Sequence, residues 1–166
     1  LEHERCRKYE GLVFAPPPVA VPDEHYNLWR GFACAPLATV DEAPIARYLT
    51  HIHDVICSGN GDHTNYVLDL FAVTVQQPGT PTGKALALRG GQGVGKSVLF
   101  KSFGRLFGRH FMTISSRKHI TGEFNAHLSG KVVVFADEAI WGGNRQDVGT
   151  LKRLITEDTL VIERKG

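Results

Sequence analysis

Acidic residues are missing from a long stretch in the middle of this 166-residue sequence. Residues 85–122 contain no Asp or Glu, but they contain the basic residues Arg89, Lys96, Lys101, Arg105, Arg109, Arg117 and Lys118. The formal net charge of the whole chain is only +2, so no overall basic field requires nucleic acid as a partner. The local positive charge therefore suits a bound nucleotide as well as a nucleic acid.

Cysteine and long apolar runs are also scarce. The three cysteines, Cys6, Cys34 and Cys57, have no metal-like pairing, which fits a reducing compartment. No apolar run approaches the ~20 residues of a membrane-spanning helix, and no signal peptide is visible. With 42% hydrophobic and 22% charged residues, the composition is that of an ordinary globular domain. We therefore expect a cytoplasmic protein with no membrane partner.

Glycine is concentrated in one stretch, GGQGVGKS at residues 90–97, which has the spacing G-x-x-x-x-G-K-[ST] of a phosphate-binding loop. The predicted nucleotide-binding residues are Gly90, Gly91, Gln92, Gly93, Val94, Gly95, Lys96, Ser97 and Val98. Glycines let the backbone curl tightly and aim its N–H groups at phosphate oxygens. Lys96 can reach the β- and γ-phosphates, and the Ser97 hydroxyl can ligate Mg²⁺. The alternative is a glycine-rich turn that matches by accident.

The flanks of this loop fit a phosphate-binding site, which requires a preceding strand and a following helix. The apolar run at residues 85–89 predicts a buried strand. Apolar residues recur at helical spacing after the loop, namely Val98, Leu99, Phe103, Leu106 and Phe107. Gly108 then offers a stop.

The residues before the loop divide into two predicted regions. Residues 1–35 form an irregular arm rich in proline, and Tyr26, Leu28, Trp29 and Phe32 are expected to pack it onto the domain. The alternative is that these aromatic side chains stack on bases. Residues 36–82 form a helical accessory region, with helices at 41–57, capped by Asp41 or Thr39, and at 64–75.

A zinc site is an alternative function for part of this helical region. Its candidate ligands are His51, His53, Cys57 and His63. His53 and Cys57 share one helix face, but no second spaced pair completes four ligands. Scattered polar or half-buried side chains are the simpler interpretation.

Residues 83–166 form the predicted core. A strand is expected at 111–115, then a short helix with Ile120, Phe124 and Leu128 on one face. The β-branched run at 131–136 predicts a central strand buried on both faces, ending in Asp137 and Glu138. Ligands of open α/β sheets bind at the carboxyl ends of strands, so both carboxylates are expected beside the phosphate loop.

These carboxylates suit two different roles. Asp137 would hold Mg²⁺ together with Ser97, and Glu138 would be the base that activates water. The alternative is a strand that ends in a polar turn. Residues 150–158 follow as an amphipathic helix, and residues 159–166 alternate toward a strand.

Three blocks in the right order resemble superfamily-three helicases, closest to the ATPase portion of virus, phage and plasmid primase-helicases. The blocks are GGQGVGKS, TGEFNAHLSGKVVVFADEA and LKRLITEDTLVIERKG. The resemblance implies a P-loop NTPase fold of the AAA+-like type, a three-layer α/β sandwich with a central parallel sheet. It also implies an ATP- and Mg²⁺-dependent DNA helicase that acts in replication of such an element, in a bacterial or virus-infected host cell.

The resemblance also implies partners and missing parts. The expected partners are single-stranded or forked DNA, contacted by Lys152, Arg164 and Lys165, and identical subunits in a hexamer. The family's sensor strand and arginine finger do not occur in this sequence, so we expect a truncated core that is inactive in isolation. The sensor strand would lie between the strands at 85–89 and 131–136, leaving a gap there. The alternatives are a P-loop phosphotransferase and a nucleotide-dependent DNA-binding switch or loader.

Overall fold

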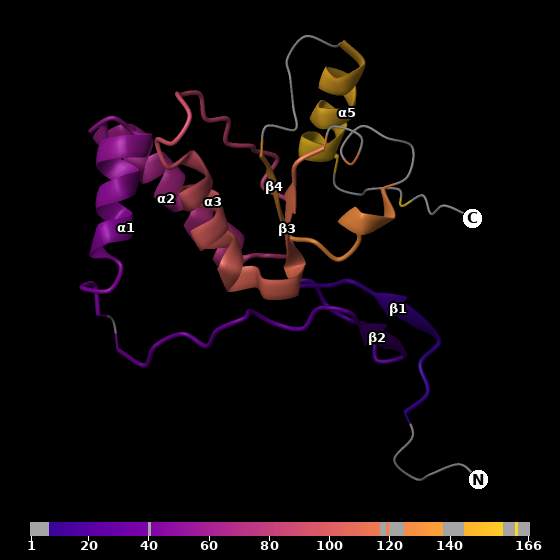
Figure 1. The fold of residues 1–166 in the computed structure, drawn as a ribbon. Helices are drawn as coiled ribbons and strands as arrows, with labels where there is room; N and C mark the ends of the chain where they lie inside the picture. The colour runs from indigo at the N-terminus through magenta and orange to yellow at the C-terminus, as the bar shows by residue number, and fades with distance from the viewer. Residues whose placement is uncertain are drawn as a thin grey trace.

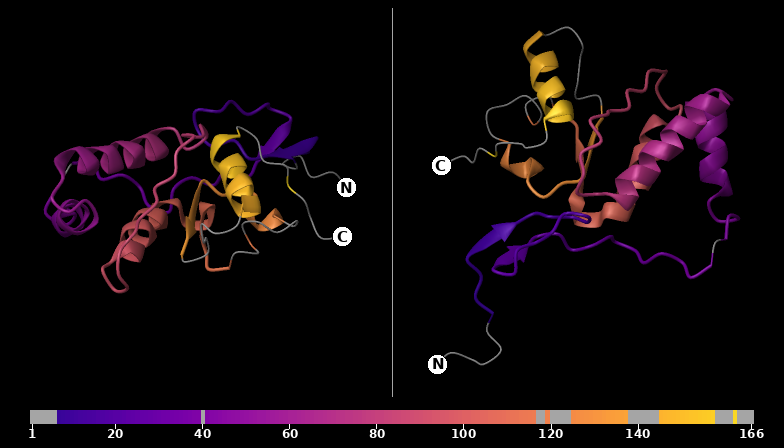
Figure 2. Two further views of the ribbon diagram at one scale, coloured as in Figure 1. Left: turned by 90° about the horizontal axis from the view of Figure 1, so that it is seen from above. Right: turned by 180° about the vertical axis from the view of Figure 1, so that it is seen from behind.

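The structure is a computed structural model that describes residues 7–39, 41–116, 119, 125–137, 145–157 and 162. Figure 1 shows the helices α1, α2 and α3 on one flank, the strands β3 and β4 at the centre, and α5 beyond them. The N-terminal arm runs along the base of this assembly, which is also evident from behind in Figure 2. No helix among the described residues is long and apolar enough to cross a membrane.

The N-terminal arm contains two short parallel strands, β1 (Gly11–Val13) and β2 (His25–Asn27). The Asn27 side chain ties the segments together, because it accepts hydrogen bonds from the amides of Ala15 and Trp29 and donates one to the Ala15 carbonyl. The Trp29 ring stacks on His110 at a centroid distance of 4.6 Å. Phe32 likewise contacts Phe107 of the main core, so the predicted packing of the arm onto the domain is confirmed for Trp29 and Phe32, whereas the Tyr26 ring packs on Tyr9 and Arg30 within the arm.

His110 is 2% exposed, and each of its ring nitrogens has a backbone hydrogen-bond partner. Nδ1 lies 2.8 Å from the Gly130 carbonyl, and Nε2 accepts the Arg30 amide at 3.0 Å. Since a carbonyl only accepts and an amide only donates, these bonds fix the tautomer with hydrogen on Nδ1. The histidine thus satisfies two backbone groups from different segments.

The helical region contains α1 (Ala46–Thr50), the π-helix η1 (His51–Ile56) and α2 (Gly61–Gln76). The prediction of a helix beginning after Asp41 or Thr39 is wrong in its start. Asp41 instead accepts the Ala43 amide at 3.0 Å in a local turn, and the helix begins at Ala46 without a side-chain cap. Pro44 lies between them and favours an extended or turn conformation in the residue before it. Asn60 caps α2 by accepting the His63 amide.

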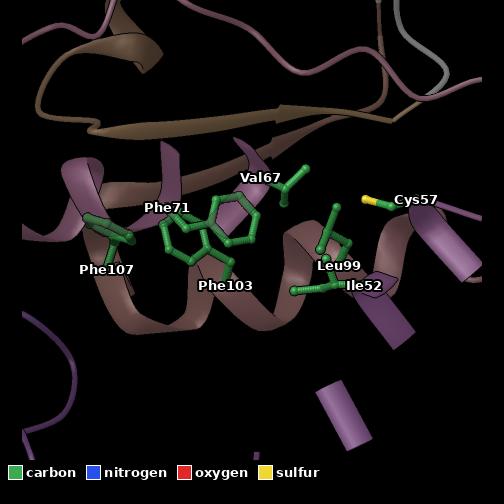
Figure 3. Close-up of a cluster of buried hydrophobic side chains, with 7 residues drawn as sticks. All are labelled: Ile52, Cys57, Val67, Phe71, Leu99, Phe103 and Phe107. Atoms are coloured by element: carbon green, nitrogen blue, oxygen red, sulfur yellow. The ribbon is translucent and has the colours of Figure 1, made fainter. Parts of the chain in front are cut away.

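The main core joins this helical region to α3 (Lys96–Gly104) and the following 3-10 helix η2 (Arg105–His110). Figure 3 shows the buried side chains, with the rings of Phe71 and Phe103 stacked at 3.8 Å. Ile52, Leu99 and Phe107 are completely buried in the same cluster. Because each such side chain contributes about 1.5–3 kcal/mol on burial, this core binds the two regions firmly together.

The strands β3 (Phe111–Ile114) and β4 (Val133–Ala136) form a parallel pair in which Phe111 lies opposite Val133 and Ile114 opposite Ala136. One face packs on α3, where Phe100 stacks on Phe135 at 4.9 Å. The other face packs on α5 (Arg145–Thr156) through Leu151 and Leu154. A short 3-10 helix, η3 (Ala126–Leu128), precedes β4 and adds Leu128 to that side.

Two expectations about strands are wrong within the described residues. Residues 85–89 form no strand, because no neighbouring strand pairs with them, although Leu86 and Leu88 do pack against the main core. β4 is not a central strand among the described residues, since it pairs with β3 alone. It is also not buried on both faces, because Val134 is 45% exposed. The larger central sheet of an AAA+-like sandwich remains a prediction. So does the division at 1–35, 36–82 and 83–166.

Some predicted elements lie outside the described residues. These are most of the helix expected around Ile120 and Phe124, and nearly all of the strand expected at 159–166. The helix expected at 150–158 is observed as α5, which begins five residues earlier, at Arg145.

Candidate nucleotide-binding site

The glycine-rich loop has the backbone conformation that its sequence predicts. Gly93 and Gly95 have φ angles of 81° and 87°, in the left-handed region where residues with a Cβ are strained. Gly95 is the N-cap of α3, so the loop leads directly into a helix N-terminus. The amides of the first helical turn and the helix dipole both favour an anion at this position. Gln92, Gly93 and Val94 are exposed to solvent.

Lys96 folds back over the loop that precedes it. Its Nζ donates to the carbonyl oxygens of Gly90 and Gly91, at 2.8 and 2.6 Å. The ammonium group is thereby held over the loop rather than extended into solvent. A phosphate oxygen in the loop would offer the same donor a charged acceptor, which makes a stronger hydrogen bond than a neutral carbonyl.

Ser97 and Asp137 meet although they are 40 positions apart in the chain. The Ser97 hydroxyl donates to the Asp137 carboxylate, at 3.1 Å from Oδ1 and 3.3 Å from Oδ2. Asp137 follows β4 directly, and its amide continues the ladder by donating to the Ile114 carbonyl at 2.8 Å. This backbone bond aims the carboxylate at the start of α3, as predicted from the strand end.

Lys101 is a third member of this cluster that the sequence reasoning did not single out. Its Nζ lies 3.3 Å from Oδ2 of Asp137. Lys101 is one helical turn beyond Ser97, so both side chains project from the same face of α3 toward the carboxylate. The signal in the sequence was the i,i+4 spacing from the motif serine.

A cavity of about 310 Å³ lies beside the loop, between the helical region and residues 86–89. Its lining includes Cys57, His63, Tyr66, Leu88, Arg89 and Lys96. Apolar surface, an aromatic ring and two cations surround the space, and none of the described residues that line it carries a carboxylate. This chemistry suits an anionic ligand that carries a planar apolar group.

The other predicted site residues are placed as follows. Val98 is 53% exposed, and its amide donates back to the Gly95 carbonyl. Lys152 is exposed on α5. Glu138, Arg164 and Lys165 lie outside the described residues.

The zinc alternative finds no support in the described part of the chain. No cluster of three or more His, Cys, Asp or Glu that could hold a metal occurs there. His51 instead contacts the Gly95 carbonyl, and His53 bonds the Thr64 hydroxyl at 3.0 Å. Cys57 is buried as a free thiol in the main core.

A divalent cation fits the Ser97–Asp137 pair by its donor set. Both groups offer oxygen, which Mg²⁺ prefers, and one carboxylate with one hydroxyl leaves room for waters and phosphate oxygens. Asp137 is 31% exposed, so its carboxylate is accessible from solvent. The hydrogen bond between the two side chains shows that both reach the same point.

Comparisons with known proteins find a match to a family model over part of the chain and a solved structure of similar fold. A family model described as "Family of unknown function (DUF5906)" matches residues 88–166, just under half of the chain, including the phosphate loop and Asp137. A solved structure titled "The apo structure of NrS-1 C terminal region" is similar in fold, with a TM-score of 0.72 and 23% identity. The match covers 95% of this chain and 38% of that one. No curated protein matches the sequence.

Proposed function

We propose that this chain is the nucleotide-binding core of an ATP-driven DNA helicase of the superfamily-three type. In this proposal it serves replication of a phage, virus or plasmid-like element, within a homo-hexamer that moves along single-stranded or forked DNA. The chain spans 38% of the NrS-1 region that it resembles, so the activity proposed is that of a longer assembly.

The observation that carries the proposal is the contact between Ser97 and Asp137. A glycine-rich turn that matched the motif by accident would have no reason to meet a carboxylate at the end of a parallel strand. In P-loop NTPases, the loop hydroxyl and this aspartate together hold Mg²⁺ against the phosphates. The left-handed glycines and the position of Lys96 support the same function.

The proposed roles follow from the chemistry of each group. Lys96 and the loop amides bind the phosphates, and their positive charge stabilises the charge that develops during phosphoryl transfer. Ser97 and Asp137 hold Mg²⁺, which neutralises phosphate charge when bound. Glu138 accepts a proton from the attacking water. The cavity beside the loop takes the base and sugar of the nucleotide.

The DNA-binding part of the proposal rests on the sequence resemblance. Lys152 is exposed and available for a phosphate contact, which positions DNA without reading its sequence. Arg164 and Lys165 belong to the same resembling block. Together they would contribute a salt-dependent term to DNA affinity.

The proposal is tested first by nucleotide titration. Lys96→Ala should weaken Mg·ATP binding at least about tenfold, because it removes a charge-assisted contact worth ~1.5–3 kcal/mol. Lys84→Ala is the matched control, since it removes an exposed lysine shortly before the loop. Equal affinity of Lys96→Ala and wild type would place the nucleotide elsewhere or nowhere.

Turnover in the full-length protein then separates the candidate functions. A helicase motor hydrolyses ATP faster with single-stranded DNA, and Glu138→Gln should abolish turnover while ATP affinity survives. Phosphoryl transfer to a small acceptor would indicate a phosphotransferase. Nucleotide-dependent DNA binding without hydrolysis would indicate a switch or loader.

A further inference from the structure

The π-helix η1 places one histidine against the phosphate loop. It continues α1 without a break and contains the wider hydrogen bond from the Cys57 amide to the Ile52 carbonyl, at 2.9 Å. Short π-helical segments are rare and frequently occur at functional sites. Here the segment directs His51 to the loop while Ile52, the next residue, is completely buried in the core beside Leu99.

The contact joins His51 to the last glycine of the loop. Nε2 of His51 lies 3.1 Å from the Gly95 carbonyl oxygen. A carbonyl only accepts, so Nε2 carries the hydrogen. The approach also depends on glycine for space, because a Cβ on Gly95 would lie 2.5 Å from Cε1 of His51. A glycine is therefore required at position 95 for two reasons: the left-handed φ, and the close approach of the His51 imidazole.

Tyr48 makes a parallel contact one turn further along α3. Its hydroxyl donates to the Leu99 carbonyl at 2.7 Å, and burial raises the pKa of this phenol to about 12. Tyr48 of α1 and His51 at the start of η1 thus both contact the N-terminal part of α3. Tyr48 contacts the helix itself, whereas His51 contacts the peptide that enters it, so their effects on stability and on the loop are separable.

We infer that His51 is a positioning residue for the nucleotide phosphates, an inference that rests on the function proposed above. The Gly95 carbonyl and the Lys96 amide belong to one planar trans peptide, in which C=O and N–H point in opposite directions. The Gly95 carbonyl also accepts the Val98 amide at 3.0 Å, so His51 and the first helical turn together fix the orientation of this peptide and with it that of the Lys96 N–H. His51 thereby shapes the phosphate site without itself contacting a phosphate.

The test compares two substitutions of the same residue. His51→Leu removes the donor, and His51→Gln keeps an N–H at a similar distance from the backbone. Since a neutral hydrogen bond contributes ~0.5–1.5 kcal/mol, Mg·ATP affinity should fall about three- to tenfold in the leucine variant and at most about twofold in the glutamine variant. Tyr48→Phe is the matched control, expected to lower the melting temperature but not the affinity.

A second measurement needs no nucleotide. Without nucleotide, the Lys96 amide should have a different solvent-exchange rate and a different NMR chemical shift in His51→Leu than in wild type. Both quantities should be the same in Tyr48→Phe as in wild type. An unaltered Lys96 amide, or equal affinities of His51→Leu and wild type, would overturn the positioning role. Equal losses in the leucine and glutamine variants would do the same. Failure of wild type to bind nucleotide would refute the proposed function, while the amide measurement still decides the role of His51.

Discussion

Lys101 competes for the carboxylate that the proposed function assigns to Mg²⁺. Its ammonium lies 3.3 Å from Oδ2 of Asp137, so a bound cation has to displace it or share the carboxylate with it. The lysine is 50% exposed, and exposed ion pairs contribute only ~0.2–1 kcal/mol. A divalent cation can therefore displace the Lys101 ammonium from Asp137.

Lys101→Met should lower the Mg²⁺ concentration that half-saturates nucleotide binding, by about two- to fivefold for an ion pair of this strength. The measurement is a Mg²⁺ titration of ATP binding at fixed ionic strength. Arg105→Met is the control, because it removes an exposed cation one turn further along the chain. An equal shift in both variants would mean that general electrostatics, and not the contact with Asp137, sets the Mg²⁺ requirement.

The residues of the site were predictable to the extent that the motif specifies them. Ser97 and Asp137 were expected to meet because strand ends and the loop share one edge, and they do. Lys101 and His51 were not assigned to the site. His51 was considered only as a zinc ligand. Its contact with Gly95 depends on how two helices pack, and the spacing of residues in the sequence does not predict that packing.

At the scale of elements, the turn after α2 anchors the N-terminal arm through Gly79. The Gly79 amide donates to the Pro17 carbonyl at 2.8 Å. A Cβ on Gly79 would collide with the Pro16 carbonyl oxygen and approach the Val19 side chain to 2.7 Å. The turn and the proline-rich segment therefore lie in direct backbone contact, which only a residue without a side chain permits.

Gly79→Ala should destabilise the protein by about 1–3 kcal/mol, because the added methyl group meets backbone atoms that do not yield easily. Gly61→Ala is the matched control, since Gly61 begins α2 and has nothing within 4 Å of its ideal Cβ position. That variant should be neutral or more stable, by up to ~1 kcal/mol, because alanine favours the helix. Urea unfolding midpoints decide the matter, and an unaffected Gly79→Ala would contradict the docking of the arm.

Elements with strong local signals were predicted best. The apolar periodicity of α2 and the β-branched run of β4 both led to the observed element type. Residues 85–89 show the limit of such reasoning. Leu86 and Leu88 are half-buried, whereas Ala85, Ala87 and Arg89 are exposed. A strand also needs a partner to pair with, and the partner is not specified by the local sequence.

At the scale of the whole molecule, the described residues form one unit across the predicted regional boundaries. The main core takes side chains from η1, α2 and α3, and the β3–β4 pair lies between α3 and α5. The predicted α/β sandwich with a central parallel sheet stays a prediction. Within the described residues, the central sheet consists of β3 and β4 alone, and residues 85–89 do not pair with it.

The backbone of residues 85–89 gives the sharpest test of that arrangement. Among the described residues, no backbone hydrogen bond is made by the amides of 85–89, although the Leu86 and Leu88 side chains pack against the main core. In β3 and β4, by contrast, amides are paired in a parallel ladder that the Asp137 amide extends. Half-buried side chains beside amides that have no backbone partner among the described residues fit a segment with no neighbouring strand there.

Amide hydrogen exchange on residues 1–166 should therefore be fast at 85–89 and at least about a hundredfold slower in β3 and β4, because pairing protects amides from solvent. α2 serves as an internal reference for a stable, hydrogen-bonded element. Slow exchange at 85–89, equal to that of β4, would mean that these residues pair directly with another strand. Direct pairing with β4 would favour the phosphotransferase alternative, because the helicase-type core places another strand between these two segments.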